Sequence, residues 1–387
     1  MHKFMRYALA LLLVAGVSLG VVYPAVTHSI EKVSTITGGS SGFFWIFAPV
    51  KIEDVVTCAN GDAWAIGIGP GAFDDAALFR VTGMNTGSPK VAGVIGFDDP
   101  SLEEGNNYPA GMGPRGFPGL AVSFDCSTAY FGNFFGGSVV SVDLNAGVLN
   151  WPANFVADDT TGLFTADSRV LGAPVDVQLN GIADTRVYVG DSDGSIAVMS
   201  ASTGAVLASY KTSGIGPGSL VAGGDAWVAA VQNRGGIACI DLVSGKEHKV
   251  AAKSLGINPF MAVASGDLNR MYVSNQGSNS VSVLSGGGCA KSVVKTISVG
   301  NSPRHLALSP DNQFLYVSNS TDNTISVIDT GSLSVVATID VATSDPAPIG
   351  HVVVSNNNRY VYVFYEGGPR SAAGTFQFIG YDVSGLY

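Results

Sequence analysis

Charged residues are scarce in this sequence. Asp, Glu, Lys and Arg make up 13% of its 387 residues, against roughly 25% in an ordinary soluble protein. The formal net charge is −10, so the protein would be repelled by phosphate groups, and nucleic-acid binding is not expected. So little charge also gives a surface that resists self-association poorly. This fits a protein that assembles, or one that works in acid, where carboxylates are protonated.

Motifs for catalysis and for cofactors are missing too. The sequence has no nucleophile elbow, no phosphate-binding loop and no HExxH, and no CxxC or CxxCH that would indicate a zinc ribbon or a c-type haem. We therefore predict no resident cofactor, with one possible metal site described below. We also favour a role other than catalysis.

Amphipathic helices are not recognisable after residue 30, and a repeat of short strands takes their place. Its clearest unit runs from Ser302 to Asp329, and the unit before it aligns with Pro259 and Tyr272 each 44 residues ahead of Pro303 and Tyr316. The runs are rich in Val, Ile and Tyr and are separated by Gly, Asn, Asp and Ser, which is typical of strands joined by tight turns. A fixed period of this size indicates a propeller or a solenoid.

Seven such units can be traced, each with four strands, which predicts an all-β, seven-bladed propeller of four-stranded blades. The last unit stops at Tyr387 without its fourth strand. Val33–Ile36 repeats the sequence pattern of that strand (Val294–Ile297 and Val336–Ile339) before the first unit begins. We therefore expect Val33–Ile36 to complete the last blade beside Phe376–Asp382, which would leave no open sheet edge where the ring closes.

The segments Tyr272-Val273-Ser274-Asn275 and Tyr316-Val317-Ser318-Asn319 resemble the YVTN β-propeller repeat. That family is typical of surface-layer and secreted proteins of archaea and bacteria. The resemblance implies a fold and a location more than an activity, because related propellers include structural surface proteins, lactonase-like enzymes and subunits of redox enzymes.

The N-terminus carries an export pattern. Lys3 and Arg6 precede an apolar run from Ala8 to Val22, which predicts a signal peptide within residues 1–29. An uncleaved membrane anchor is the alternative. Either reading places the single propeller domain, residues 30–387, outside the cytoplasm or at the cell surface. Its only contact with a membrane would be through that segment.

Four cysteines are present. Outside the cytoplasm they can form two disulfides, with three possible pairings. Cys58 and Cys126 fall in similar parts of neighbouring units, as do Cys239 and Cys289 more loosely, so we favour those pairs over buried free thiols.

Two of the five histidines stand at matching positions in adjacent units. His305 and His351 each come just before the first strand of a blade, where the first unit has Asp54. Ring closure would make all three neighbours at the mouth of the central channel, where they could ligate a metal. The other units have Asp176, Leu120, Ser219 and Met261 there. The alternative is that these side chains bond to the backbone of the next blade.

Other candidate sites are weaker. Asp191-Ser192-Asp193-Gly194-Ser195 resembles the start of a calcium loop but lacks the later glutamate, so we expect a hairpin turn. Asn319-Ser320-Thr321 is a glycosylation sequon, expected on a loop. Two apparent insertions, Gly67–Gly116 and Trp151–Ser168, carry acidic residues that could bind calcium or a partner, although solvated loops are the simpler reading. These acidic residues are Asp98, Asp99, Glu103, Glu104, Asp158, Asp159 and Asp167.

Together these features predict an extracellular structural or interaction propeller. Its expected partners are copies of itself or other cell-surface proteins, as in a surface layer, sheath or filament. A lactonase-like or metal-dependent hydrolase with its site at the channel mouth is the first alternative, since catalytic residues scattered around an axis escape a motif search. A monomeric propeller that binds a ligand or partner is the second.

Overall fold

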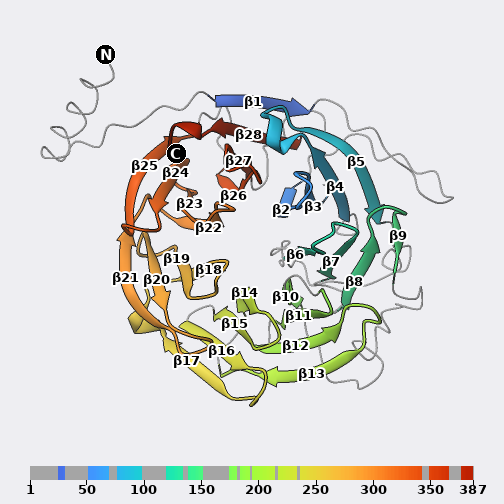
Figure 1. Ribbon diagram of the computed structural model, residues 1–387, viewed down its shortest axis with the longest axis vertical. Coiled ribbons are helices and arrows are strands. Elements are labelled where there is room, and N and C mark those ends of the chain that lie inside the picture. Colours follow the sequence, from blue (N-terminus) through green and yellow to red (C-terminus); the bar gives the residue numbers. More distant parts are fainter. Residues whose placement is uncertain are drawn as a thin grey trace, which may run out of the picture.

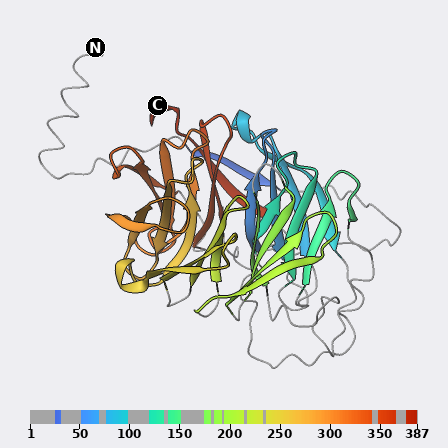
Figure 2. The ribbon, with the colours of Figure 1, turned by 60° about the horizontal axis from the view of Figure 1, so that its bottom comes forward.

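The computed structural model describes twelve segments of the chain: residues 25–30, 51–68, 76–97, 119–133, 138–150, 174–180, 184–191, 194–213, 217–232, 236–341, 348–365 and 376–386. Their strands form seven four-stranded antiparallel sheets arranged as blades around one axis (Figure 1). The turned view shows the blades as separate sheets standing next to one another in a ring (Figure 2). The predicted fold is confirmed: this is a seven-bladed β-propeller.

Each blade is a meander whose first strand lies innermost. Blade 1 contains β2 (Lys51–Thr57), β3 (Ala63–Ile68), β4 (Ala76–Thr82) and β5 (Lys90–Phe97). Blade 2 contains β6 (Leu120–Val122), β7 (Thr128–Asn133), β8 (Ser138–Asp143) and β9 (Val148–Leu149). Blade 3 contains β10 (Pro174–Leu179), β11 (Arg186–Asp191), β12 (Ser195–Ser200) and β13 (Val206–Lys211). Blade 4 contains β14 (Pro217–Gly223), β15 (Trp227–Gln232), β16 (Gly236–Asp241) and β17 (Glu247–Ala251).

The remaining blades follow the same order. Blade 5 contains β18 (Pro259–Ala264), β19 (Arg270–Asn275), β20 (Ser280–Ser285) and β21 (Ser292–Ser298). Blade 6 contains β22 (Pro303–Leu308), β23 (Phe314–Asn319), β24 (Thr324–Asp329) and β25 (Ser334–Asp340). Blade 7 contains β26 (Ile349–Val354), β27 (Tyr360–Tyr365), β28 (Phe376–Asp382) and, outermost, β1 (Ala25–Ile30). The helices among the described residues are three single 3-10 turns: η1 (Met84–Thr86), η2 (Ala252–Ser254) and η3 (Ser384–Leu386), and none is long and apolar enough to cross a membrane.

The hydrophobic core lies between the blades. Seven apolar clusters form among the described residues, one at each boundary between neighbouring blades. The tyrosines of the repeated second strand are among the largest fully buried side chains. They are Tyr188, Tyr272, Tyr316 and Tyr362. One sheet cannot bury both of its faces alone, so each blade depends on both neighbours and the fold is stable only as a closed ring.

An N-terminal strand closes the ring, as predicted, but this strand is β1 and not the expected segment. β1 pairs with β28 over six residues, from Ala25 opposite Tyr381 to Ile30 opposite Phe376 (Figure 1). The expected strand, Val33–Ile36, lies outside the described residues. Both segments combine β-branched residues with polar ones, and the outermost strand of a blade has one neighbour only, so its sequence specifies position and register weakly. All of β1 except Ile30 falls within the predicted signal peptide or anchor, residues 1–29, so cleavage after Ala25 would shorten this strand.

The predicted bounds of the first insertion were too wide. Gly67–Gly116 contains β4 and β5, which are the third and fourth strands of blade 1. Their sequence is rich in Ala and Gly, which hid the strand pattern. Residues 98–118, with the acidic candidates of that segment, lie outside the described residues, as does all of Trp151–Ser168.

Candidate functional site

The inner strands share an irregularity at one position near the axis. In six of the seven blades the register between the first and second strand shifts there, as between Pro303 and Leu306 on β22. Such a bulge re-aims side chains and interrupts pairing. In the two best repeats a serine of the second strand holds the bulge: Ser318 Oγ accepts from His305 N at 3.1 Å and Ser274 Oγ accepts from Met261 N at 3.2 Å.

Pairing with the second strands defines one equivalent residue per blade, here called the axial ring. Leu120 pairs with Phe131 as Val177 pairs with Val189, so the ring residue of blade 2 is Gly119 and the assignment of Leu120 was wrong. Unlike the other inner strands, β6 shows no register shift that would mark the equivalent position. The axial ring is Asp54, Gly119, Asp176, Ser219, Met261, His305 and His351.

Three of the polar ring residues, Asp54, Asp176 and Ser219, bond to the backbone of the next blade. Asp54 Oδ2 accepts from Leu120 N at 2.7 Å, and Asp176 Oδ2 accepts from Leu220 N at 2.5 Å. Ser219 Oγ accepts from Ala262 N at 3.4 Å. The second oxygen of each carboxylate accepts from the following residue of its own strand, at 2.7 Å for Val55 and 2.8 Å for Val177. For Asp54 and Asp176 this is the inter-blade role expected as the alternative to a metal site.

Two of the carboxylates converge across the glycine of blade 2. A methyl group on Gly119 would overlap with Asp176 Oδ1 and would lie 3.2 Å from Asp54 Oδ2. Glycine is therefore the residue that lets the Asp54 and Asp176 carboxylates share this space. Burial raises the pKa of the Asp176 carboxyl to about 7, and the charge of Asp54 acts in the same direction.

The two histidines complete the ring at the seam. His351 Nδ1 lies 3.4 Å from Asp54 Oδ1 and so joins blade 7 to blade 1. The His305 and His351 rings have centroids 3.6 Å apart, and both residues are buried. His305 also meets the edge of Phe260 at 5.5 Å, and the Arg304 guanidinium lies 4.8 Å from the centroid of that ring. Sequence reasoning missed Phe260 and Arg304, whose only signal was their place directly before the ring residues.

The three residues proposed as metal ligands are thus brought together, as ring closure implied. Asp54 already accepts two backbone hydrogen bonds and faces His351. Within the described segments, no group of three or more His, Cys, Asp or Glu side chains is placed to hold a metal ion. A metal here stays a prediction without structural support.

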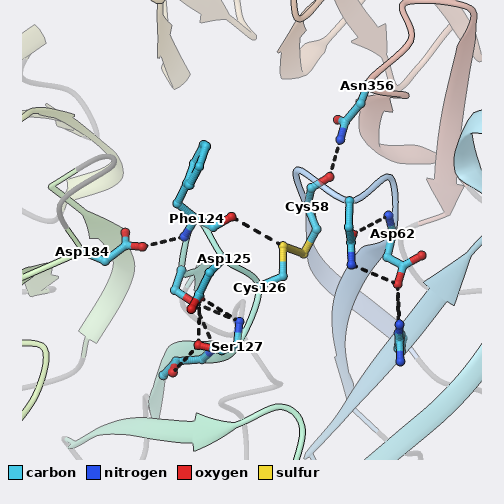
Figure 3. Close-up of a disulfide and its surroundings, with 12 residues drawn as sticks. Cys58, Asp62, Phe124, Asp125, Cys126, Ser127, Asp184 and Asn356 are labelled. Atoms are coloured by element: carbon cyan, nitrogen blue, oxygen red, sulfur yellow. Dashed lines mark hydrogen bonds and ion pairs between the residues drawn. A yellow bond between two sulfur atoms is a disulfide. The ribbon is translucent and has the colours of Figure 1, made fainter.

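On the turns between the first and second strands, a second set of contacts joins the blades. Cys58 is bonded to Cys126 from blade 1 to blade 2, the pair favoured from the sequence (Figure 3). Asn356 Nδ2 of blade 7 donates to Cys58 O, and Phe124 N donates to Asp184 Oδ2 of blade 3 at 2.6 Å (Figure 3). Burial raises the pKa of the Asp184 carboxyl, whereas the hydrogen bond from Ser123 is the main reason that the pKa of Asp125 is lowered.

The other four boundaries are bridged as well. Cys239 of blade 4 is bonded to Cys289 of blade 5, which is the second favoured pair. Asn180 Nδ2 donates to Asp225 Oδ1 at 2.9 Å, Gly266 N to Asn312 Oδ1 at 2.8 Å, and Asp311 N to Asn358 Oδ1 at 3.4 Å. Every blade boundary therefore carries a polar or covalent bridge in addition to its apolar cluster.

The predicted glycosylation site does not lie on a loop. Asn319 ends β23 and is fully buried. Its Nδ2 donates to Thr324 Oγ1 at 3.0 Å and to Ser326 Oγ at 2.9 Å inside the blade, so its amide is not accessible for glycan attachment in the folded protein. The expected hairpin at Asp191–Ser195 is confirmed: it joins β11 to β12, with Gly194 at φ +89°.

Comparison with known protein families gives a match over part of the chain. A family model described as "Lactonase, 7-bladed beta-propeller" matches residues 261–341, which span β18 to β25 and so cover most of blades 5 and 6. No curated protein matches. The chain is similar to that family over these two blades and is a β-propeller protein.

Proposed function

We propose that this protein is a structural or interaction propeller outside the cytoplasm, and that it assembles with copies of itself into a surface layer, sheath or filament. One observation carries the proposal. Three of the five polar residues around the axis, where a propeller enzyme would hold its catalytic groups, bond to the backbone of the next blade: Asp54, Asp176 and Ser219. With seven bridged boundaries, the molecule is built to keep its shape and is suited to serve as a unit of assembly.

Several features support the location. The two disulfides fit an oxidising compartment, and Lys3, Arg6 and the apolar run after them fit export. The resemblance to the YVTN repeat points to secreted and surface proteins. A charge fraction of 13% spreads net repulsion thinly over the surface, which favours repeated contacts between subunits.

The proposal is tested by negative-stain microscopy of the native, oxidised protein across pH and calcium concentration. We expect ordered sheets or fibres with a repeat set by one propeller. Contacts that are not two-fold propagate in this way, whereas two-fold contacts alone stop at a dimer. Isolated rings under every condition would contradict self-assembly and favour an enzyme or a ligand-binding propeller.

A lactone hydrolase is the second candidate, favoured by the family match over residues 261–341 and by Asp176, whose pKa of about 7 keeps a proton on a buried acid beside Asp54. In this reading the Asp54–His351 pair takes a proton from the attacking water. As the ring C–O bond of the lactone breaks, Asp176 protonates the leaving oxygen.

A pH-stat assay over a panel of lactones tests whether the protein is a lactone hydrolase. Hydrolysis lost in Asp54→Asn and kept in Ser219→Ala would establish the enzyme, whereas no hydrolysis by the native protein would exclude it for that panel.

A further inference from the structure

The closing strand β1 reaches its blade from a distant part of the chain. It pairs with β28 from Ala25 opposite Tyr381 to Ile30 opposite Phe376. Figure 1 shows it at the outside of blade 7, where it also touches β5 of blade 1. Each other outer strand among the described residues follows the third strand of its own blade in the chain, whereas β1 comes before every blade begins. No hairpin of blade 7 therefore ties β1 to the sheet that it completes.

The chain between β1 and blade 1 is long enough to let β1 reach a neighbouring molecule. The 20 residues from 31 to 50 separate Ile30 from Lys51 at the start of β2. A chain of that length spans at most about 70 Å. A folded chain of this size has a radius of gyration of about 21 Å. β1 can therefore pair with β28 of its own molecule or with β28 of a second copy beside it.

Blades 7 and 1 are also joined by contacts that do not involve β1. An apolar cluster with residues of both blades lies between them. Tyr362 Oη of blade 7 donates to Met84 O of blade 1 at 2.8 Å, and Asn357 Nδ2 donates to Asn85 O at 2.9 Å. Because these contacts close the ring, we expect a molecule whose β1 is displaced to keep the propeller shape and to have an open sheet edge at β28.

The open edge of β28 matches β1 of any copy of the chain. An unpaired edge presents a row of N–H and C=O groups that bind another extended segment. β1 of a second copy offers the same six residues in the same register, so exchange replaces hydrogen bonds within one molecule by identical ones between two. Exchange of an identical element costs little and makes association depend on protein concentration.

We propose that β1 of one copy completes blade 7 of another copy, so that the exchanged strand links neighbouring molecules of the assembly. This inference rests on the proposed function and deepens it by naming one of the contacts. Each copy gives a strand at β1 and receives one at β28, which are different surfaces. The contact is therefore head-to-tail and extends into a fibre, whereas two copies that exchange strands with each other stop at a dimer.

The exchange requires that β1 stays on the mature protein. Removal of the apolar run from Ala8 to Val22 leaves the strand intact, because β1 begins at Ala25. We expect the intact mass of the exported protein to place its N-terminus at or before Ala25. An N-terminus later than Ala25 would shorten or remove the exchanged strand and would overturn the proposal.

The first test locks β1 onto its own blade. Ser29 lies opposite Gln377, and paired residues of antiparallel strands are close enough for a disulfide. The full-length double variant Ser29→Cys with Gln377→Cys is oxidised at low concentration, so that the new bond forms within one chain. In sedimentation velocity it should stay at the size of one chain at concentrations where the native protein associates. Ser29→Ala with Gln377→Ala is the matched control and should associate as the native protein does, and unfolding curves check that both variants are folded.

The second test detects the exchanged strand directly. Full-length Ser29→Cys and full-length Gln377→Cys are mixed under the conditions of assembly and then oxidised. We expect a covalent dimer in which mass spectrometry finds the two new cysteines linked. In the control, Ser209→Cys replaces Gln377→Cys, because Ser209 is an exposed serine on the outer strand of blade 3. It should give no such link with Ser29→Cys.

The outcomes separate strand exchange from assembly itself. If the native protein assembles but the locked variant associates equally well, or the mixed variants give no linked dimer, then β1 is not exchanged and assembly proceeds through other surfaces. If the native protein does not associate under any condition, this inference and the proposed function fail together.

Discussion

At the scale of single residues, each position of the Tyr-Val-Ser-Asn repeat has its own task. The tyrosine and valine fill the space between blades, and the serine holds the bulge that carries the axial residue. The asparagine braces the hairpin: Asn275 Nδ2 donates to Ser282 Oγ at 2.9 Å as Asn319 Nδ2 does to Ser326 Oγ. Its amide also packs on a glycine before the blade, so that a Cβ on Gly300 would lie 2.6 Å from Asn319 Nδ2. The repeat is a structural motif, and its presence alone indicates no chemistry.

Replacing the repeat asparagine should therefore destabilise the protein. Asn319→Ala leaves buried hydroxyl groups without a donor and is expected to lower the free energy of unfolding by about 1–3 kcal/mol. Asn145→Ala, at an exposed turn, is the control and should stay within about 0.5 kcal/mol of the native protein. Urea unfolding measures both. Equal stability of the two variants would show that the amide of Asn319 is dispensable.

The buried Asp176 makes stability depend on pH. Its pKa is raised from 3.8 to about 7 by burial, so between these values the folded protein holds a proton that the unfolded chain has released. The contribution of this proton to the free energy of unfolding is therefore fully present below about pH 4 and is lost as pH rises through about 7. We expect the melting temperature to fall over this range in the native protein and to fall less in Asp176→Asn. Parallel profiles of the two proteins would contradict this assignment.

At the scale of elements, the two disulfides tie neighbouring blades together. They link cysteines that are 68 and 50 residues apart in the chain, so we expect the two disulfides to contribute similarly to the free energy of unfolding. Replacing both cysteines of either pair by serine should cost about 2–4 kcal/mol in the free energy of unfolding. Denaturant unfolding of each double variant measures this. Peptide mapping under non-reducing conditions checks the pairing, and four thiols open to alkylation in fresh native protein would contradict it.

The closing strand offers a second test at this scale. A chain that begins at Glu31 lacks β1 and leaves β28 as an open edge, so it should be less stable and should aggregate, whereas a chain that begins at Ala25 should behave as the full chain. Size-exclusion chromatography and thermal unfolding compare the two. Equal behaviour would mean that β1 is not needed, and loss of stability only on removal of Val33–Ile36 would assign closure to that segment.

How much of the structure could be predicted differs from element to element. The 44-residue spacing of Pro259 and Pro303 revealed the repeat, and tracing its units along the chain gave the blade count, because short strands joined by hairpins leave a periodic pattern. The convergence of Asp54 and Asp176 on Gly119 could not be predicted, because it depends on a bulge in the inner strands and on the packing of three blades. β4 and β5 were missed because Ala and Gly carry little strand signal.

At the scale of the whole molecule, the ring consists of equivalent blades with unequal surfaces. Near the axis, Asp54, Asp176 and Ser219 bond to the backbone of the next blade, and Val294, Val335 and Val336 are exposed on the outer strands of blades 5 and 6. Bridged blade boundaries and a low fraction of charged residues suit the structural or interaction role that we propose. We propose that this role is carried out by contacts between copies of the protein.

Sedimentation velocity of the native, oxidised protein over a wide range of concentration tests that claim most directly. We predict that the weight-average sedimentation coefficient rises steadily with concentration, beyond the value for a dimer, because contacts between copies that are not two-fold keep adding subunits. A single species at the mass of one chain, 39.7 kDa before any processing, at every concentration and from acid to neutral pH would contradict it.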